Sequence, residues 1–266
     1  MVEATDQKPA RPVTVALVKM VPEKGQLKAN WRRLERVLER LEQRGDRLDC
    51  VVTPECLLDG YYAAAPEWDA TTFEEIAQVA ERSEYVRMAE SWARRLNSYL
   101  VFCFTERLAD GCYNAARLVD RTGAHVGTYY KTHLQDHDLR FRPGPGLPCF
   151  DTDFGRVGLA ICADRRWPEV IRCLRLQGAE VVLIPSYGWH HLDNEWWMRT
   201  RAYENEAFVL FAHPNVAFVA SPTGDLEAKL ESALDDSLVH RFDLRACTTT
   251  MLASRRPELY GAICNP

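Results

Sequence analysis

The chain has 266 residues, a hydrophobic content of 47% and a formal net charge of −5. We expect a single domain over residues 1–266, with disorder over about residues 1–11, because this length can bury one large core. The 33 basic against 38 acidic side chains lack the basic excess typical of nucleic-acid-binding proteins. No apolar run approaches the roughly 20 residues that cross a bilayer. Neither nucleic acid nor a membrane is therefore an expected partner.

Short apolar runs and helical repeats alternate along the first part of the chain. Apolar residues recur at intervals of three and four over residues 27–41 and again over residues 73–92, which predicts two helices. Residues 113–130 are typical of a strand, a turn and a second strand. The pattern indicates an α/β protein with mixed sheets, whose strands we expect at residues 13–18, 50–53, 99–104, 115–119, 157–162, 181–185, 208–212 and 216–220.

The nine cysteines include no C-x-x-C pair and no histidine at zinc-finger spacing. The sequence therefore signals neither a zinc site nor a redox pair. The odd number and the lack of a signal-peptide pattern at the N-terminus favour reduced thiols in the cytoplasm. For most of these cysteines we expect ordinary packing as small hydrophobic side chains.

One cysteine has a more informative position. Cys162 ends an apolar run that predicts a buried strand, and Asp164, Pro168 and Glu169 follow it as a helix-start signal. Free backbone N–H groups and the positive end of a helix dipole stabilise a thiolate and bind a developing oxyanion. Cys162 is therefore the candidate nucleophile, and a buried structural thiol is the alternative.

A thiol nucleophile needs a base and a group that stabilises the oxyanion, and two other strand ends offer them. Glu55 follows an apolar strand and Pro54, where a carboxylate can project into a cleft. Lys131 ends the second strand of the predicted hairpin. Taken singly, each is more typical of a solvated surface charge.

These three segments together resemble the nitrilase, or carbon-nitrogen hydrolase, superfamily. The main motifs are Pro54-Glu55, Tyr-Lys-Thr-His-Leu at 130–134 and Cys-x-Asp-x-Arg-x-Pro-Glu at 162–169, in that order. Further markers are Tyr-Asn-Ala-Ala at 113–116, Phe-Arg-Pro-Gly at 141–144, Arg-Ala-Tyr-Glu-Asn at 201–205, Ser-Pro-Thr-Gly at 221–224 and Arg-Pro-Glu-Leu-Tyr at 256–260. The resemblance extends from the first strand to about residue 260.

The resemblance implies a four-layer α-β-β-α sandwich that assembles into homodimers or larger oligomers. It implies that Glu55 is the general base, that the Lys131 ammonium stabilises the tetrahedral oxyanion and that Cys162 forms a thioester-type intermediate. The backbone N–H of Ala163 would be a second oxyanion donor. No metal or organic cofactor is implied.

The chain departs from the family pattern in two places. Many relatives carry a second glutamate six residues before the proline of the Phe-x-Pro-Gly marker, and here that position is His137. Asp136 or Asp138 could supply the carboxylate if the loop shifts by one residue. A glycine-rich hairpin common in relatives is also missing after residue 212, so we expect part of the second sheet or one pocket wall to be trimmed.

The cysteine segment looks most like the N-carbamoyl-D-amino-acid amidohydrolase branch and unlike nitrile-cleaving members. In that branch paired arginines help to hold a substrate carboxylate, which makes Arg165 or Arg166 a candidate clamp. The alternative is that one arginine pairs with a structural acid such as Asp164 or Glu169 and the other meets solvent. The aromatic candidates for the pocket wall are Tyr61, Tyr187 and Trp189.

The sequence thus predicts a hydrolase that cleaves the carbon–nitrogen bond of a small linear amide or an N-carbamoyl amino acid. The alternative is a catalytically impaired relative that serves as a dimeric small-molecule-binding or scaffold protein. The intact Glu55, Lys131 and Cys162 favour the enzyme.

Overall fold

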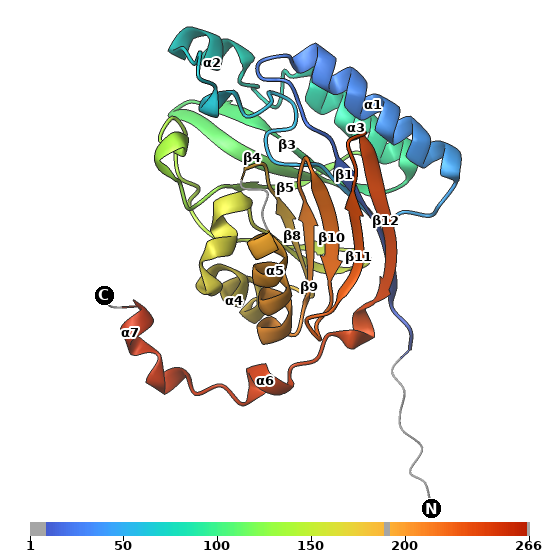
Figure 1. The fold of residues 1–266 in the computed structure, drawn as a ribbon, viewed down its shortest axis with the longest axis vertical. Coiled ribbons are helices and arrows are strands. Elements are labelled where there is room, and N and C mark those ends of the chain that lie inside the picture. The colour runs from blue at the N-terminus through green and yellow to red at the C-terminus, as the bar shows by residue number, and fades with distance from the viewer. Residues whose placement is uncertain (1–8, 189–191, 265–266) are drawn as a thin grey trace, which may run out of the picture.

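The computed structural model describes residues 9–188 and 192–264, in which two sheets of six strands lie face to face (Figure 1). In the first sheet the strands are ordered β12-β1-β2-β3-β4-β5. Their bounds are Pro12–Lys19 for β1, Cys50–Val52 for β2, Tyr99–Leu108 for β3, Gly111–Val119 for β4, His125–Tyr130 for β5 and Asp236–Asp243 for β12. β1, β2 and β3 run parallel, whereas β12, β4 and β5 pair antiparallel with their neighbours.

The second sheet has the order β11-β10-β9-β8-β7-β6 and is mixed in the same way. Its strands are β6 Cys149–Thr152, β7 Gly155–Leu159, β8 Val181–Pro185, β9 Phe208–Ala212, β10 Val216–Ala220 and β11 Leu226–Glu231. β7, β8 and β9 are parallel, and the outer pairs on both sides are antiparallel. In each sheet the parallel strands end at the same edge, so the loops that follow them meet there.

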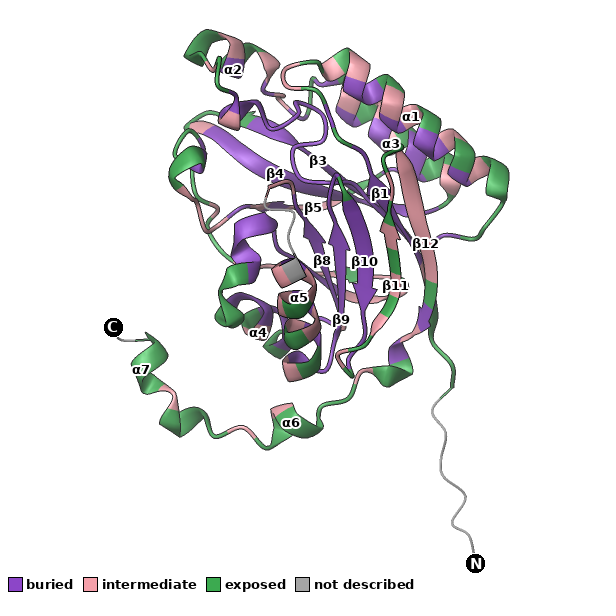
Figure 2. Ribbon diagram, viewed as in Figure 1, coloured by how far each residue is buried: buried purple, intermediate pink, exposed green. Residues whose placement is uncertain are grey.

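Alternation along the strands divides the core into layers. In β1, Val13, Val15 and Leu17 pack between the two sheets, whereas Ala16 and Val18 pack beneath helices. This is the two-residue period of a strand that is buried on both faces. Both faces of the central strands are therefore buried (Figure 2).

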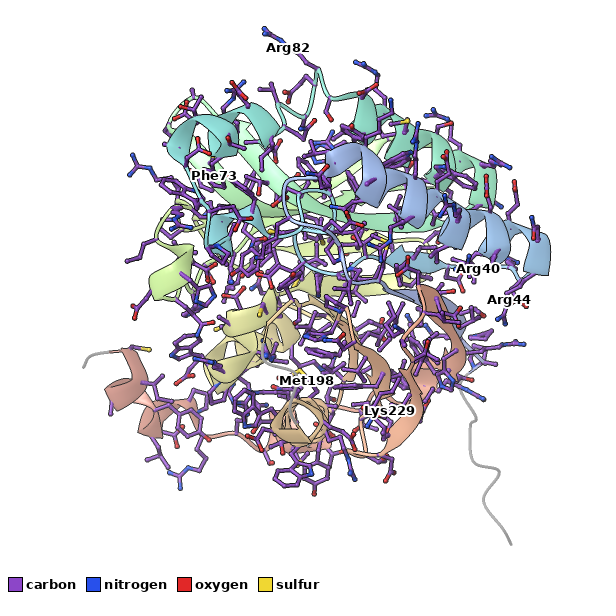
Figure 3. All side chains as sticks on the ribbon, turned by 45° about the horizontal axis from the view of Figure 1, so that its top comes forward. Arg40, Arg44, Phe73, Arg82, Met198 and Lys229 are labelled. Atoms are coloured by element: carbon purple, nitrogen blue, oxygen red, sulfur yellow. The ribbon has the colours of Figure 1, made fainter. Side chains whose placement is uncertain are left out.

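Two helices cover the outer face of each sheet. α1 Leu27–Arg44 and α3 Glu84–Leu96 lie on the first sheet, and α4 Pro168–Leu176 and α5 Leu192–Asn205 lie on the second. Met198 of α5 is fully buried among the side chains of this outer layer (Figure 3). The arrangement confirms the predicted α-β-β-α sandwich with mixed sheets.

The second predicted helix is wrong in its extent. Residues 73–92 belong to two helices, α2 Ala70–Ile76 and α3, because the chain between them pairs with β3. Gln78 N–H donates to the Thr105 carbonyl at 2.8 Å, and its own carbonyl accepts from Arg107 N–H at 2.8 Å. Ser83 then caps α3 by accepting from Val86 N–H.

The missing hairpin does not leave the second sheet smaller than the first. β9 and β10 are joined by residues 213–215 and pair antiparallel, and β11 extends the sheet beyond them. The amphipathic strand β11 and its neighbour in sequence, β12, were not among the predicted strands. Each is an edge strand of its sheet.

Short elements complete the described chain. They are the 3-10 turns η1 Tyr62–Ala64, η2 Asp136–Asp138, η3 Cys162–Arg166, η4 Leu244–Ala246 and η5 Pro257–Leu259, and the helices α6 Thr250–Ala253 and α7 Gly261–Cys264. The segment with α6 and α7 arcs away from the sandwich, with α6 below α5 and α7 to the left of α4 in this view (Figure 1). Of the expected disordered N-terminus, residues 1–8 lie outside the described residues, and Arg11 is ion-paired with Glu180. No helix in the described ranges is long and apolar enough to span a membrane.

The loop after β2 depends on Gly60, and this dependence can be tested by Gly60→Ala. Gly60 has φ +66°, and an added Cβ would collide with the Glu23 backbone. We expect the free energy of unfolding to fall by about 3 kcal/mol, from left-handed strain plus the forced shift of the loop. Urea denaturation measures it.

The matched control is Gly45→Ala at the end of α1. Gly45 has nearly the same φ of +70°, but no atom lies within 4 Å of the added Cβ. It should lose only about 1 to 2 kcal/mol, the cost of left-handed backbone for alanine. Equal losses in the two variants would contradict the proposed collision.

Candidate active site

The loop after β2 places Glu55 in the interior. Glu55 is fully buried, and its N–H donates to the Ser186 carbonyl, which follows β8 in the other sheet. Four residues later Asp59 anchors the loop, because its carboxylate accepts from Thr105 N–H at 2.9 Å and from Tyr62 N–H at 3.2 Å. The loop is thus tied to both sheets.

Lys131 follows β5 and is also fully buried. Its Nζ lies 2.9 Å from Glu55 Oε1, 2.7 Å from Asp138 Oδ2 and 3.2 Å from the Tyr61 hydroxyl. Burial alone would lower the pKa of Lys131, but electrostatic interactions with its neighbours, Glu55 first and Asp138 also, outweigh it and raise that pKa. The ammonium is therefore held in its charged form.

Of the three candidates for the second carboxylate position, the structure brings only Asp138 to Lys131. The one-turn helix η2 turns Asp138 inward, where it accepts from Gln135 N–H at 3.2 Å and also from the Tyr61 hydroxyl. Asp136 and His137 are exposed on the same turn, and the His137 ring packs edge-on against Tyr61. Position counting pointed to His137; the structure places the carboxylate one residue later.

The two oxygens of Glu55 have different surroundings. Oε1 accepts from Lys131 Nζ and from Asn114 Nδ2, the latter at 2.8 Å. Oε2 is buried and has no hydrogen-bond partner among the described residues. A buried carboxylate oxygen left in this state is a ready proton acceptor.

Cys162 begins η3 directly after the extension of β7 and is 5% exposed. Its φ of +45° is in the left-handed region, which costs a non-glycine residue about 1 to 3 kcal/mol. Ala163 is the second residue of η3, so its N–H belongs to the first turn of the helix, where backbone N–H groups have no partner within the helix. The strand-to-helix turn predicted at Cys162 is therefore present as a 3-10 turn that leads into α4.

Asp164 connects the cysteine turn to the lysine segment. Its Oδ2 accepts from Ile161 N–H at 2.8 Å and from the Tyr129 hydroxyl at 2.6 Å. Its Oδ1 accepts from the Thr132 hydroxyl and from His133 N–H, both at 2.9 Å. Because Tyr129, Thr132 and His133 flank Lys131 in sequence, this buried carboxylate fixes Cys162 relative to Lys131.

The two arginines lie in different surroundings, and the described hydrogen bonds of Asp164 go to neither. Arg165 is buried, and its guanidinium contacts Cys162 Sγ at 3.1 Å and Asn194 Oδ1 at 2.7 Å. Arg166 is exposed, and its guanidinium lies 2.7 Å from the side-chain amide of Gln135.

The aromatic candidates form part of the same cluster. The rings of Tyr61 and Tyr187 meet edge to face with centroids 5.2 Å apart, and the Phe141 ring stacks on Tyr61 with centroids 6.4 Å apart. Lys24 Nζ lies 5.6 Å from the centre of the Tyr187 ring. Trp189 lies outside the described residues.

Sequence reasoning missed two polar residues of this site. Asn114, which contacts Glu55, falls within the Tyr-Asn-Ala-Ala marker, so a signal was present. Asn194, which contacts Arg165, had no comparable signal. Within the described chain, no group of three or more His, Cys, Asp or Glu side chains is arranged to hold a metal ion.

Comparison with known proteins gives consistent matches along the chain. The carbon-nitrogen hydrolase family model matches residues 14–254. A citrullinase from Francisella tularensis is 27% identical over 268 residues, which cover 88% of this chain and 92% of that protein. An N-carbamoylputrescine amidase from Solanum tuberosum is 27% identical over 267 residues, covering 86% and 87%. A double mutant of the amidase from Nesterenkonia sp. AN1, solved with acrylamide, has the same fold, with a TM-score of 0.79 and 19% identity over 97% of this chain and 99% of that one.

Asp59 gives the Glu55 loop a pH-dependent stability. Burial raises the pKa of Asp59 from 3.8 to about 6, although backbone N–H groups partly offset the effect. A raised carboxyl pKa stabilises the fold fully below the ordinary value, and this contribution is lost as the pH rises through about 6. Relative to Asp59→Asn, the free energy of unfolding should fall by up to about 3 kcal/mol between about pH 4 and pH 7.

Urea denaturation of both proteins at a series of pH values measures this difference. The hydrogen bond that asparagine cannot accept changes the variant's free energy of unfolding by the same amount at every pH. That amount cancels when the difference between the two proteins is compared across pH. A difference that does not vary with pH would contradict the raised pKa.

Proposed function

The chain belongs to the carbon-nitrogen hydrolase family, and on that premise we propose that it hydrolyses a small linear amide or an N-carbamoyl amino acid. The observation that carries the proposal is the contact of a buried Lys131 ammonium with both Glu55 and Asp138 beside Cys162. The unpartnered Oε2 of Glu55 adds a proton acceptor to the same site.

The proposed reaction begins with proton transfer from the Cys162 thiol to Glu55 Oε2. The sulfur attacks the carbonyl carbon, and the resulting oxyanion is stabilised by Lys131 Nζ and by the N–H of Ala163. Glu55 then gives its proton to the leaving nitrogen, so that the carbon–nitrogen bond breaks and a thioester remains on Cys162. Glu55 next activates water, which releases the acid and restores the thiol.

The names of the relatives support this class of substrate. One relative is a citrullinase and another acts on an N-carbamoyl amine by its name, while the Nesterenkonia enzyme was solved with an amide. Tyr61, Tyr187 and Trp189 remain our candidates for the pocket wall. Arg166, exposed near the site, is the candidate for holding a substrate carboxylate, and assembly into a homodimer or larger oligomer stays a prediction.

Hydrolysis can be tested by ammonia release from a panel of small amides and N-carbamoyl amino acids. We expect turnover by the wild type and a loss of at least about 10³-fold in Cys162→Ala, because the nucleophile is removed. Cys56→Ala serves as the matched control, since Cys56 is also buried and neighbours Glu55 in sequence. No turnover of any substrate, together with a Cys162 no more reactive toward electrophiles than the other thiols, would favour the non-catalytic binding protein instead.

Asp138→Asn tests the second carboxylate. Removal of this charge leaves Lys131 with one anionic partner, so we expect kcat to fall by about 10²-fold and the free energy of unfolding to fall by about 3 kcal/mol. Asp136→Asn, two residues away and exposed, should change neither quantity. Steady-state kinetics and urea denaturation measure both, and equal behaviour of the two variants would rule out the assigned role of Asp138.

A further inference from the structure

A second buried cation lies beside the nucleophile. Arg165 is 1% exposed and stands three residues after Cys162 in η3. In a 3-10 helix there are three residues per turn, so side chains at positions i and i+3 eclipse one another. The guanidinium is therefore brought to Cys162, and its NH1 lies 3.1 Å from Sγ.

Among the described residues, the other side chains that contact the Arg165 guanidinium are uncharged. Nε and NH2 both donate to Asn194 Oδ1, at 2.9 and 2.7 Å. The rings of Phe211 and Trp197 lie 5.5 and 5.9 Å from the guanidinium carbon. Among the described residues no carboxylate lies within ion-pair distance of Arg165, although a buried charge without a partner is costly.

The sulfur of Cys162 can provide the missing negative charge. A guanidinium is always protonated and only donates hydrogen bonds, so the atom that it contacts must accept. A thiol sulfur is a weak acceptor, whereas a thiolate carries a full charge. At 3.1 Å the guanidinium would therefore bind a thiolate sulfur more strongly than a thiol sulfur.

The buried carboxylate of Asp164 has its own donors in Ile161 N–H, the Tyr129 and Thr132 hydroxyls and His133. The other charged groups that contact Lys131 or Cys162 balance when Arg165 is included. Glu55 and Asp138 are the anions, and Lys131 and Arg165 are the cations, of one buried cluster. With a neutral thiol the cluster has no net charge. Proton transfer from the thiol to Glu55 keeps it neutral, and afterwards Lys131 faces Asp138 while Arg165 faces the thiolate. Without Arg165 the buried cluster would carry a net negative charge in both states.

We infer that Arg165 is a catalytic residue that serves as the counter-ion of the Cys162 thiolate, and that Asn194 positions its guanidinium. The inference rests on the proposed function, in which Cys162 is the nucleophile. It differs from a carboxylate clamp, since a clamp would direct the guanidinium to the substrate and leave the free enzyme's thiol unaffected.

Alkylation by iodoacetamide tests the inference without a substrate. This reagent is uncharged and has no carboxylate, so a clamp cannot influence it. The rate at Cys162, followed by peptide mass spectrometry to separate it from the other thiols, is measured from about pH 5 to pH 9. In Arg165→Gln we expect the midpoint of the pH profile to rise by at least about one pH unit and the rate near pH 7 to fall about tenfold.

Further variants at Arg165 and at Asn194 keep the test valid if Arg165→Gln fails to fold. Arg165→Lys retains the charge without the planar fork and should restore part of the rate. Asn194→Asp retains the shape but adds an anion that competes for the guanidinium, so the midpoint should again rise. Arg156→Gln is the control, since Arg156 lies on β7 ahead of Cys162 and donates to Asp151, and it should leave the alkylation profile unchanged.

The outcomes separate this inference from the proposed function. Unchanged alkylation profiles in Arg165→Gln and Asn194→Asp would overturn the counter-ion role. If those variants instead raised KM only for carboxylate-bearing substrates, Arg165 would be a clamp and the inference would again fail. Absence of ammonia release from the wild type would overturn the proposed function, whereas a shifted alkylation profile would still support the Arg165–Cys162 pair.

Discussion

The buried ammonium of Lys131 is the constraint on which the site depends. A fully buried lysine would lose its charge or destabilise the fold unless anions surrounded it. Glu55 and Asp138 provide them at 2.9 and 2.7 Å, and each comes from a loop outside the sheets. Because the removal of either anion would leave buried charge uncompensated, the charges themselves hold these loops in position.

Asp164 extends this control to the other sheet. Lys131 follows a strand of the first sheet and Cys162 follows a strand of the second, so their separation depends on how the sheets stack. The carboxylate of Asp164 accepts hydrogen bonds from residues beside Lys131 and from Ile161 N–H beside Cys162. It therefore stabilises both the spacing of the two groups and the left-handed backbone of Cys162.

Local sequence patterns predicted the parts of the molecule that depend on local chemistry. Alternation in β1 and the helical repeat of α1 identify buried faces directly. Three short motifs mark Glu55, Lys131 and Cys162 as candidates. The division of residues 73–92 was missed because Gln78 pairs with a strand that is distant in sequence. The contact between Arg165 and Asn194 was missed for the same reason, since residues 29 positions apart meet only after the second sheet has folded.

The segment between Lys131 and Cys162 shows that the position of a charge in space can be met from different positions in the chain. The ammonium requires a carboxylate oxygen at hydrogen-bond distance. The place of that carboxylate in space matters, and its position in the chain does not. A single turn at η2 directs Asp138 inward, although the position count falls on His137. His137 lies on the exposed side of that turn, where its ring packs against Tyr61. In this chain the carboxylate that meets Lys131 therefore comes from Asp138.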